Sequence, residues 1–512
     1  MGMGRMWGMV VVVVVVVMVG SMFGAAVGQH QFDLVHAYAH MEEGRREGGS
    51  SGEYRQVLQE HDRRRLRRMM LEVVAFPITG DDDIFTTGLY YTRISLGTPP
   101  QQFYVHVDTG SDVAWVNCEP CSSCRRASNV ALPISVYDPR KSSTMTGISC
   151  TDPECKVAAY PGNPTCSSNP LECPYSTLYG DGSSTNGYFV NDLFTFSQVQ
   201  SGNATTTTGS ATLTFGCGSN QTGTWATDGL IGFGQSPIAV TSQLSEQNKT
   251  VNIFAHCLQG DNQGSGSLVI GNIQEPDVVY TPIVPRQNHY NVELLNIAVR
   301  GVNVTTPAAF DLSSTGGVIM DSGTTLTYLV QPAYGQFQAG VIDAAPVAPS
   351  NIPDYQGNSQ TCFIYSYSIE GNFPNLTLYF AGGAVMTLGP SSYLYKQTLN
   401  SGLTAYCFSW MESTNTPGYL SYTIFGDNVL KDKLVVYDNV DKKLGWKNFD
   451  CTKGILVSST ATSAPVTVLP SQAGPPGAFG NTPSDAHANR AAFFSCWLCI
   501  VWIAFLVCHS FL

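Results

Sequence analysis

The stretch Val107-Asp108-Thr109-Gly110-Ser111 decides the fold of this chain. It follows an aromatic and β-branched run, residues 103–107, of the kind that forms a buried strand. Such a strand places a carboxylate at the edge of an apolar interior, which is costly unless hydrogen bonds or a shared proton compensate. The arrangement recurs in residues 318–324, where an apolar strand runs into Asp321-Ser322-Gly323-Thr324. One Asp-Thr-Gly could be an ordinary turn, but two copies in matching strands indicate a duplicated half that brings two carboxylates together.

Two carboxyl groups in contact cannot both ionise easily, so they share one proton and titrate as a coupled pair. The ionised member can take a proton from a bound water, while the protonated member donates to the carbonyl that the water attacks. We expect Asp108 and Asp321 to share these two roles. The neighbouring glycines would allow close approach and the neighbouring hydroxyls would hold the carboxylates. These supporting residues are Thr109, Gly110, Ser111, Ser322, Gly323 and Thr324.

The two motifs resemble the catalytic dyad of pepsin-like aspartic proteases, and other segments resemble further landmarks of that family in the same order. The run Tyr179-Gly180-Asp181-Gly182-Ser183 is similar to the flap, with Tyr179 as the flap tyrosine and Trp115 as its tryptophan partner. Residues 228–234 and 423–427 resemble the apolar segments that lie behind each active-site loop. The similarity covers about residues 85–451 and is greatest to the plant nepenthesin- and nucellin-like branch, particularly to its lipid-anchored members.

This resemblance implies an all-β, bilobal, double β-barrel fold with pseudo-two-fold symmetry and an active-site cleft between the lobes. We expect an N-terminal lobe with the flap over residues 79–275 and a C-terminal lobe over residues 276–455. The expected activity is that of an aspartic endopeptidase, a monomer without metal or organic cofactor that takes an extended polypeptide substrate at acidic pH. The alternative is a catalytically silent pepsin-fold protein that acts as an inhibitor or binding module, although both aspartate motifs are whole here.

The N-terminal residues indicate targeting and processing rather than a folded lobe. Residues 1–28 combine a sparse positive start, an apolar run and small residues at the end, which predicts a secretory signal peptide. A retained membrane anchor is the alternative. Residues 29–78 are densely charged and contain a basic run at residues 63–68, which predicts the propeptide of a zymogen that covers an acidic cleft. The alternative is a solvated helix face or a simple processing site.

The C-terminal residues predict a lipid anchor. Residues 456–490 are rich in Ser, Thr, Pro, Gly and Ala and are expected to form a linker. Residues 491–512 are almost continuously apolar, which together with the spacer predicts a GPI-attachment signal. Ser484 is the preferred attachment residue, with Gly480 and Asn481 as rivals, and a transmembrane helix is the alternative reading. The protein is therefore expected at the outer face of the plasma membrane or in the extracellular space.

Composition narrows the partners of the protein. The chain has 512 residues, more than one hydrophobic core usually supports, so two lobes are expected. Its formal net charge is −12, which argues against a nucleic-acid partner.

His106 shares a strand face with Asp108. A His–Asp pair is conceivable there, but we favour a packed, neutral histidine.

Cysteines and glycosylation sequons both fit a secreted protein. Of the 15 cysteines, those outside the apolar C-terminal segment form an even set between Cys118 and Cys451, which predicts six disulfides. The spacing of Cys118, Cys121 and Cys124 could suggest zinc, but no histidine accompanies it. The resemblance implies the pairs Cys118–Cys121, Cys124–Cys217, Cys150–Cys173, Cys155–Cys166, Cys257–Cys451 and Cys362–Cys407. The expected glycosylation sites are Asn203, Asn220, Asn248, Asn303 and Asn375.

Overall fold

The computed structural model describes residues 71–85, 88–124, 132–159, 166, 172–199, 206–260, 265–354, 357–413, 422–459 and 463–470. The chain divides into two units, Met1–Arg63 and Arg64–Leu512, and every described residue belongs to the second. The predicted signal peptide, the GPI-attachment signal, Ser484 and Asn203 lie outside the described residues, as does most of the predicted propeptide.

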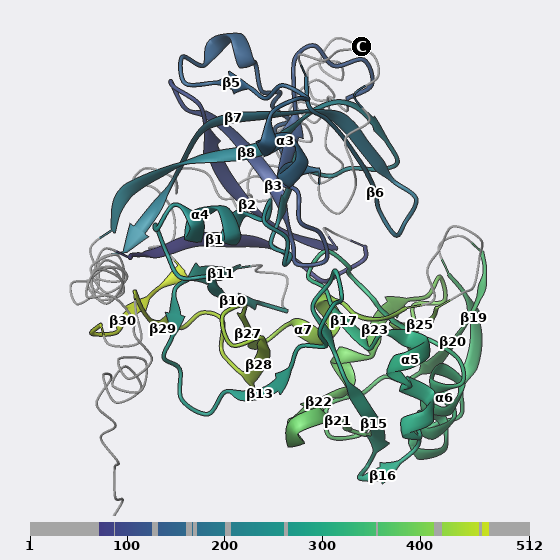
Figure 1. Cartoon of the computed structure of the whole chain (residues 1–512). Coiled ribbons are helices and arrows are strands. Elements are labelled where there is room, and N and C mark those ends of the chain that lie inside the picture. Colours follow the sequence, from purple (N-terminus) through teal and green to yellow (C-terminus); the bar gives the residue numbers. More distant parts are fainter. Residues whose placement is uncertain are drawn as a thin grey trace, which may run out of the picture. The chain divides into compact units, whose positions relative to one another are not determined.

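The N-terminal lobe is built on a large, mostly antiparallel sheet with the strand order β13-β28-β27-β10-β11-β1-β2-β3-β9-β4-β8-β7-β5, with β6 paired to β7 (Figure 1). The pairs β3–β9 and β4–β8 are parallel. Its longest hairpin is β7–β8, and β6 and β7 form the hairpin that carries the flap turn. The elements are β1 (Val73–Asp81), β2 (Leu89–Leu96), β3 (Gln101–Asp108), β4 (Trp115–Asn117), η1 (Pro139–Lys141), β5 (Thr146–Gly147), α3 (Pro153–Ala158), β6 (Pro174–Leu178), β7 (Ser184–Val199), β8 (Thr206–Thr222), β9 (Gly229–Gly232), α4 (Val240–Glu246), β10 (Ile253–Leu258) and β11 (Ser265–Ile270).

The C-terminal lobe consists of smaller sheets, and its strands β27, β28 and β13 join the large sheet next to β10. Its first elements are β12 (Asn272–Ile273), β13 (Val279–Pro282), β14 (Asn291–Val292), β15 (Leu294–Val299), β16 (Val302–Asn303), η2 (Pro307–Phe310), α5 (Leu312–Thr315), β17 (Val318–Met320), β18 (Thr327–Leu329), α6 (Ala333–Ala344), β19 (Ser350–Pro353) and β20 (Ser359–Ile364). The remaining ones are β21 (Leu376–Phe380), η3 (Ala381–Gly383), β22 (Val385–Leu388), η4 (Pro390–Ser392), β23 (Leu394–Thr398), β24 (Thr404–Phe408), β25 (Trp410–Glu412), β26 (Thr423–Phe425), α7 (Asp427–Leu430), β27 (Lys433–Asp438), β28 (Lys443–Asn448), β29 (Ile455–Ser458) and β30 (Val466–Val468).

The two halves repeat one local arrangement around each aspartate. In the first half, β3 pairs in parallel with β9, and β9 pairs in antiparallel with β4. In the second half, β17 pairs in parallel with β26, and β26 pairs in antiparallel with β18. Each aspartate-bearing strand is therefore backed by one of the apolar segments that the sequence singled out. The observed fold is all-β and bilobal, as predicted.

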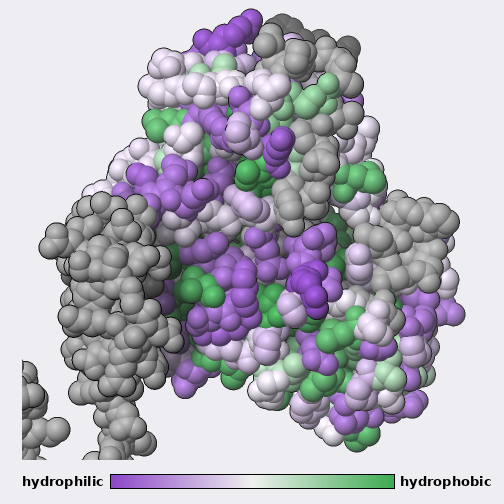
Figure 2. Space-filling view, viewed as in Figure 1, coloured by the Kyte–Doolittle hydropathy of each residue, from purple (hydrophilic) through white to green (hydrophobic). Residues whose placement is uncertain are grey.

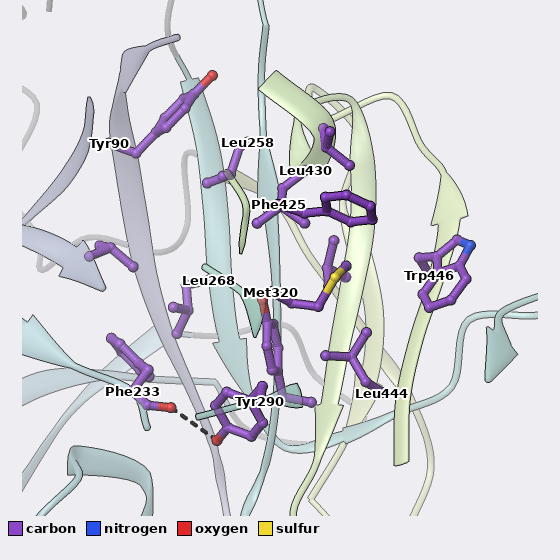
Figure 3. Packing of buried hydrophobic residues seen from close by; sticks show 14 of the residues in the cluster. Tyr90, Phe233, Leu258, Leu268, Tyr290, Met320, Phe425, Leu430, Leu444 and Trp446 are labelled. Carbon is purple, nitrogen blue, oxygen red and sulfur yellow. Dashed lines mark hydrogen bonds between the residues drawn. The ribbon is translucent and has the colours of Figure 1, made fainter. Parts of the chain in front are cut away.

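One hydrophobic core runs through both lobes. Figure 3 shows Tyr90, Phe233 and Leu268 of the first half on one side of Tyr290, with Met320 and Leu444 of the second half on the other. All these side chains are almost completely buried. On the face shown in Figure 2, the described residues are hydrophilic with scattered apolar ones between them. The dyad is thus carried by strands whose apolar side chains are buried in the interior.

Two predicted domain boundaries cut through strands. The boundary between residues 78 and 79 falls within β1, which pairs with β11 from Val74 to Thr79. The boundary after residue 455 falls within β29, which forms a three-stranded sheet with β12 and β30. Residues 73–78 and 456–468 therefore contribute strands to the folded lobes, and the predicted boundaries do not coincide with strand ends. The propeptide and linker assignments themselves stay predictions. The short strands β29 and β30 are hidden among Ser, Thr and Pro, whereas β1 is an apolar run that directly follows the charged segment.

In the ranges that the structure describes, none of the helices has the length and apolar character needed to cross a membrane.

Candidate active site

The two aspartates are held by matching sets of hydrogen bonds. Asp108 is the last residue of β3, where the Gly110 amide donates to its Oδ1 at 2.7 Å and the Ser111 hydroxyl donates to its Oδ2. Asp321 follows β17, where the Gly323 amide donates to its Oδ1 at 2.7 Å and the Thr324 hydroxyl donates to its Oδ2 at 2.7 Å. Each carboxylate thus has one oxygen on a backbone donor and the other on a side-chain hydroxyl.

Thr109 and Ser322 connect the two loops directly. The Ser322 amide donates to the Thr109 hydroxyl at 2.9 Å, and the Thr109 amide donates to the Ser322 hydroxyl at 3.3 Å. Each hydroxyl in turn donates across to the opposite strand, Thr109 to the Met320 carbonyl at 3.1 Å and Ser322 to the Val107 carbonyl at 3.0 Å. Both side chains are completely buried. Because these bonds are reciprocal, neither loop can shift without disturbing the other.

The two glycines are required by the closeness of the carboxylates. A Cβ atom on Gly110 would stand 2.5 Å from Asp321 Cγ, and a Cβ atom on Gly323 would overlap the Asp108 carboxylate. Neither neighbour is the free end of a flexible side chain, since both carboxylates are fixed by hydrogen bonds. Glycine is therefore required two residues after each aspartate, because the carboxylate of the opposite aspartate leaves no room for a side chain there.

The two carboxyl groups lie within hydrogen-bonding reach of one another, and their proton affinities differ. Burial, reinforced by the negative charge of Asp108, raises the pKa of Asp321 to about 7. Burial also raises the pKa of Asp108, while the hydrogen bonds from Ser111 and Gly110 oppose that rise. In mildly acidic solution the coupled pair therefore holds one proton between its two carboxyls.

The flap tyrosine is supported by two tryptophans. Tyr179 sits at the turn of the β6–β7 hairpin, and its hydroxyl accepts a hydrogen bond from Trp115 Nε1 at 2.7 Å. The turn is closed by Asp181, which accepts from the Ser183 amide at 2.9 Å. Trp225 packs against both aromatic partners, with ring centroids 5.2 Å from Tyr179 and 4.9 Å from Trp115. Burial raises the pKa of Tyr179 well above its usual value, so its hydroxyl stays protonated.

Sequence reasoning missed Trp225 and Asp427. Trp225 could have been noticed because it is a lone large aromatic residue in a polar stretch directly before residues 228–234.

Asp427 begins α7 behind the dyad, is 1% exposed, and has no hydrogen-bond partner on either carboxylate oxygen among the described residues. Burial and the charge of Asp321 raise its pKa well above the usual range, so it remains neutral. It therefore adds no negative charge next to the dyad.

His106 matches the favoured expectation of a packed, neutral histidine. Burial lowers its pKa to about 4, although the charge of Asp321 acts in the opposite direction. Its Nε2 atom is buried and has no hydrogen-bond partner among the described residues. No hydrogen bond to Asp108 is formed within that set, so the structure does not make the His–Asp pair that was the alternative.

The disulfides form in a partly different pattern from the one predicted. The pairs Cys257–Cys451 and Cys362–Cys407 are present as predicted. The other four predicted pairs were wrong. The structure has Cys118–Cys217, Cys121–Cys124, Cys150–Cys166 and Cys155–Cys173 instead.

The sheet register explains why Cys118 pairs with Cys217 and not with Cys121. Strands β4 and β8 are parallel with Val116 opposite Cys217, so Cys118 lies just beyond β4 with its Cα 5.2 Å from that of Cys217. Cys121 and Cys124 then close a short loop, with Cα atoms 5.6 Å apart. In the insert before the flap, Cys155 on α3 pairs with Cys173 at the start of β6, and their Cα atoms are 5.6 Å apart.

The described sequons lie mainly on the surface. Asn248, Asn303 and Asn375 are exposed, as glycosylation would require, whereas Asn220 is half-buried in β8. The Asn220 side-chain oxygen accepts a hydrogen bond from the Ser123 hydroxyl.

The fold and the paired aspartates define a pepsin-like aspartic proteinase, and comparison with known proteins agrees. Residues 90–272 match the family model described as xylanase inhibitor N-terminal, and residues 289–448 match its C-terminal counterpart. The chain is 36% identical over 446 residues to Aspartic proteinase 36 of Arabidopsis thaliana, covering 85% of this chain and 87% of that protein. It is 32% identical over 367 residues to Aspartic proteinase nepenthesin-2 of Nepenthes gracilis, covering 69% and 75%. The chain belongs to the pepsin-like aspartic proteinase family of plants.

Solved structures show the same fold at lower sequence identity. Basic 7S globulin from soybean superposes with a TM-score of 0.57 at 21% identity, covering 77% of this chain and 99% of that one. Conglutin gamma from lupine seeds gives a TM-score of 0.58 at 19% identity, covering 75% and 96%.

Proposed function

We propose that this protein is a secreted aspartic endopeptidase, made as a zymogen, that hydrolyses peptide bonds with a water activated by Asp108 and Asp321. The observation that carries the proposal is the reciprocal hydrogen bonding of the two active-site loops, which brings two buried carboxyls together. Such a pair can act as base and acid in one step, and no other part of the described chain presents a comparable arrangement. The aspartic proteinase names of the similar proteins support the same reaction class.

In the proposed mechanism, a water bound between the carboxyls is the nucleophile. Ionised Asp108 takes its proton while the oxygen attacks the carbonyl carbon of the scissile bond, and Asp321 donates its proton to the carbonyl oxygen. Collapse of the tetrahedral intermediate returns a proton to the departing amine. Tyr179 and the flap would close over the substrate, and an extended peptide would pair with the flap edge as an added strand.

The requirement for one proton on the pair of aspartates predicts the pH dependence of peptide hydrolysis. Below about pH 7 Asp321 keeps its proton, and activity should fall as the pH rises through this value because the acid is lost. At low pH activity should fall again as Asp108 becomes protonated. Initial rates on a denatured protein substrate from pH 2 to 9 would test this. A profile that stays flat between pH 4 and 8 would contradict a carboxylate dyad.

A non-catalytic function is the second candidate, because both matching family models are described as parts of a xylanase inhibitor. In that case the protein would bind a partner with its surface and hydrolyse nothing. The intact dyad and its hydrogen bonds favour the enzyme. Absence of hydrolysis over the whole pH series, combined with inhibition of a xylanase, would favour the inhibitor.

We also propose that the mature protein is held at the outer cell surface by a GPI lipid attached near Ser484. The spacer of small residues and the apolar residues 491–512 support this. Phosphatidylinositol-specific phospholipase C should then release most of the membrane-bound enzyme in soluble form. Recovery of peptides from residues 493–512 in the mature membrane-bound protein would show instead that the segment is retained as a membrane span.

A further inference from the structure

A short segment of the C-terminal lobe contacts the loops of the first active-site half. His289 and Tyr290 precede β14, and the His289 Nδ1 atom lies 2.7 Å from the Gly110 carbonyl oxygen. The Tyr290 hydroxyl lies 3.0 Å from the Phe233 carbonyl oxygen and 3.1 Å from that of Gly234. Figure 3 shows Tyr290 in the core with its hydroxyl directed at Phe233. These two neighbouring residues therefore hold both the catalytic loop and the segment that backs it.

The contact to Gly110 affects both carboxylates. The amide of this residue donates to Asp108 Oδ1, while its carbonyl receives the His289 hydrogen bond. Its Cα packs so closely on Asp321 that a side chain would collide. A displacement of Gly110 would therefore change two things at once: the hydrogen bonding of Asp108 and the distance between Gly110 and Asp321.

His289 itself is fixed from two sides. A carbonyl oxygen can only accept, so His289 must carry a proton on Nδ1, which is satisfied by one neutral tautomer and by the imidazolium. The backbone oxygen of His289 accepts from Gln235 Nε2 at 2.6 Å. Burial raises the pKa of the nearby Asp112 carboxyl, and hydrogen bonds from Ser236 together with the proximity of His289 oppose that rise.

We infer that His289 is a positioning residue for the dyad: its Nδ1–H fixes the Gly110 peptide and thereby orients Asp108 toward Asp321. Tyr290, by contrast, is completely buried and stabilises the segments behind the site. The inference rests on the proposed peptidase function, because it concerns the geometry of that reaction.

The test compares two substitutions that differ in one hydrogen-bond donor. In His289→Asn, the side-chain amide has the same number of bonds from Cβ as Nδ1, so it can still donate to Gly110. In His289→Leu, the donor is lost. We expect kcat of the leucine variant to fall roughly 10- to 100-fold with KM within about threefold of wild type, because small misplacements of catalytic groups cost this much. The asparagine variant should stay within about fivefold of wild-type kcat.

The acid limb of the kcat/KM profile provides a second measurement. A loosened Gly110 amide stabilises the Asp108 anion less, so the limb should move to higher pH in the leucine variant and stay in place in the asparagine variant. Tyr393→Phe is the structural control: Tyr393 is buried in the C-terminal lobe and its hydroxyl donates to the Pro374 carbonyl at 2.7 Å, so its loss should lower the unfolding midpoint and leave this limb where it is. If the leucine variant does not fold, His289→Gln can replace it, because its amide reaches the Nε2 position instead.

Three outcomes would overturn the inference while the proposed function stands: a leucine variant with wild-type kcat and pH profile, a change confined to KM, or equal losses in the leucine and asparagine variants. A wild-type protein that hydrolyses no peptide at any pH would overturn the proposed function and this inference together.

Discussion

Replacing either Asp108 or Asp321 by asparagine should reduce peptide hydrolysis by on the order of 10³-fold or more. Asparagine has nearly the same shape as aspartate, but it can neither take up nor release the shared proton. The two losses should be similar, because each carboxyl is needed in the same step. Initial rates of the purified variants at the pH optimum of the wild-type enzyme would measure the effect.

The control for this prediction is Asp277→Asn. Asp277 is exposed and has a φ of 62°, a conformation that asparagine tolerates well. This variant should keep wild-type activity, and all three variants should be secreted with similar unfolding midpoints. More than a few per cent of residual activity in either dyad variant would refute the assignment of the two aspartates.

Deleting residues 71–78 should prevent the protein from folding. These residues contain most of β1, whose Val73, Val74 and Phe76 are almost fully buried. The strand pairs with β11 on one side and with β2 and β7 elsewhere along its length. Each buried apolar side chain contributes about 1.5–3 kcal/mol, so their loss together would rival the roughly 5–15 kcal/mol by which domains are stable.

A deletion of residues 63–70 is the matched control, since it removes the same length of chain from just before the described strand. Secretion, and unfolding by denaturant followed through tryptophan fluorescence, would compare the two forms. We expect cooperative unfolding only when β1 is retained. Cooperative unfolding of the residue 71–78 deletion at the midpoint of the full chain would show that β1 is dispensable and that the predicted boundary at residue 79 is adequate after all.

The sequence predicted the active-site residues better than the disulfides and domain boundaries around them, because the active-site residues form local motifs. Asp108 and Asp321 each end an apolar strand and are followed by glycine and hydroxyl residues, so local pattern and repetition point to the same conclusion. The flap could be located because Tyr179 and the Gly, Asp and Ser residues after it resemble the flap of pepsin-like proteases. These features depend on a few residues that are adjacent in the chain.

The features that escaped prediction depend on contacts between distant segments. The partner of Cys118 is decided by the parallel register of β4 and β8, which no local pattern reveals. The role inferred for His289 depends on the packing of one lobe against Gly110 of the other. The strands β1, β29 and β30 were assigned to processing and linker segments because each is short or borders polar sequence, and pairing partners from elsewhere make them strands.

The position of β10 has a consequence for how the polypeptide matures during synthesis. This strand pairs with β11 on one edge and with β27 on the other, and β27 is among the last strands to leave the ribosome. Until then the outer edge of β10 has no partner in the sheet, and open edges invite association with other chains. The Cys257–Cys451 bridge, which spans 194 residues, joins these same regions and cannot close earlier. Its oxidation in newly made chains would therefore report that the sheet has been completed and the nascent protein has passed its most aggregation-prone stage.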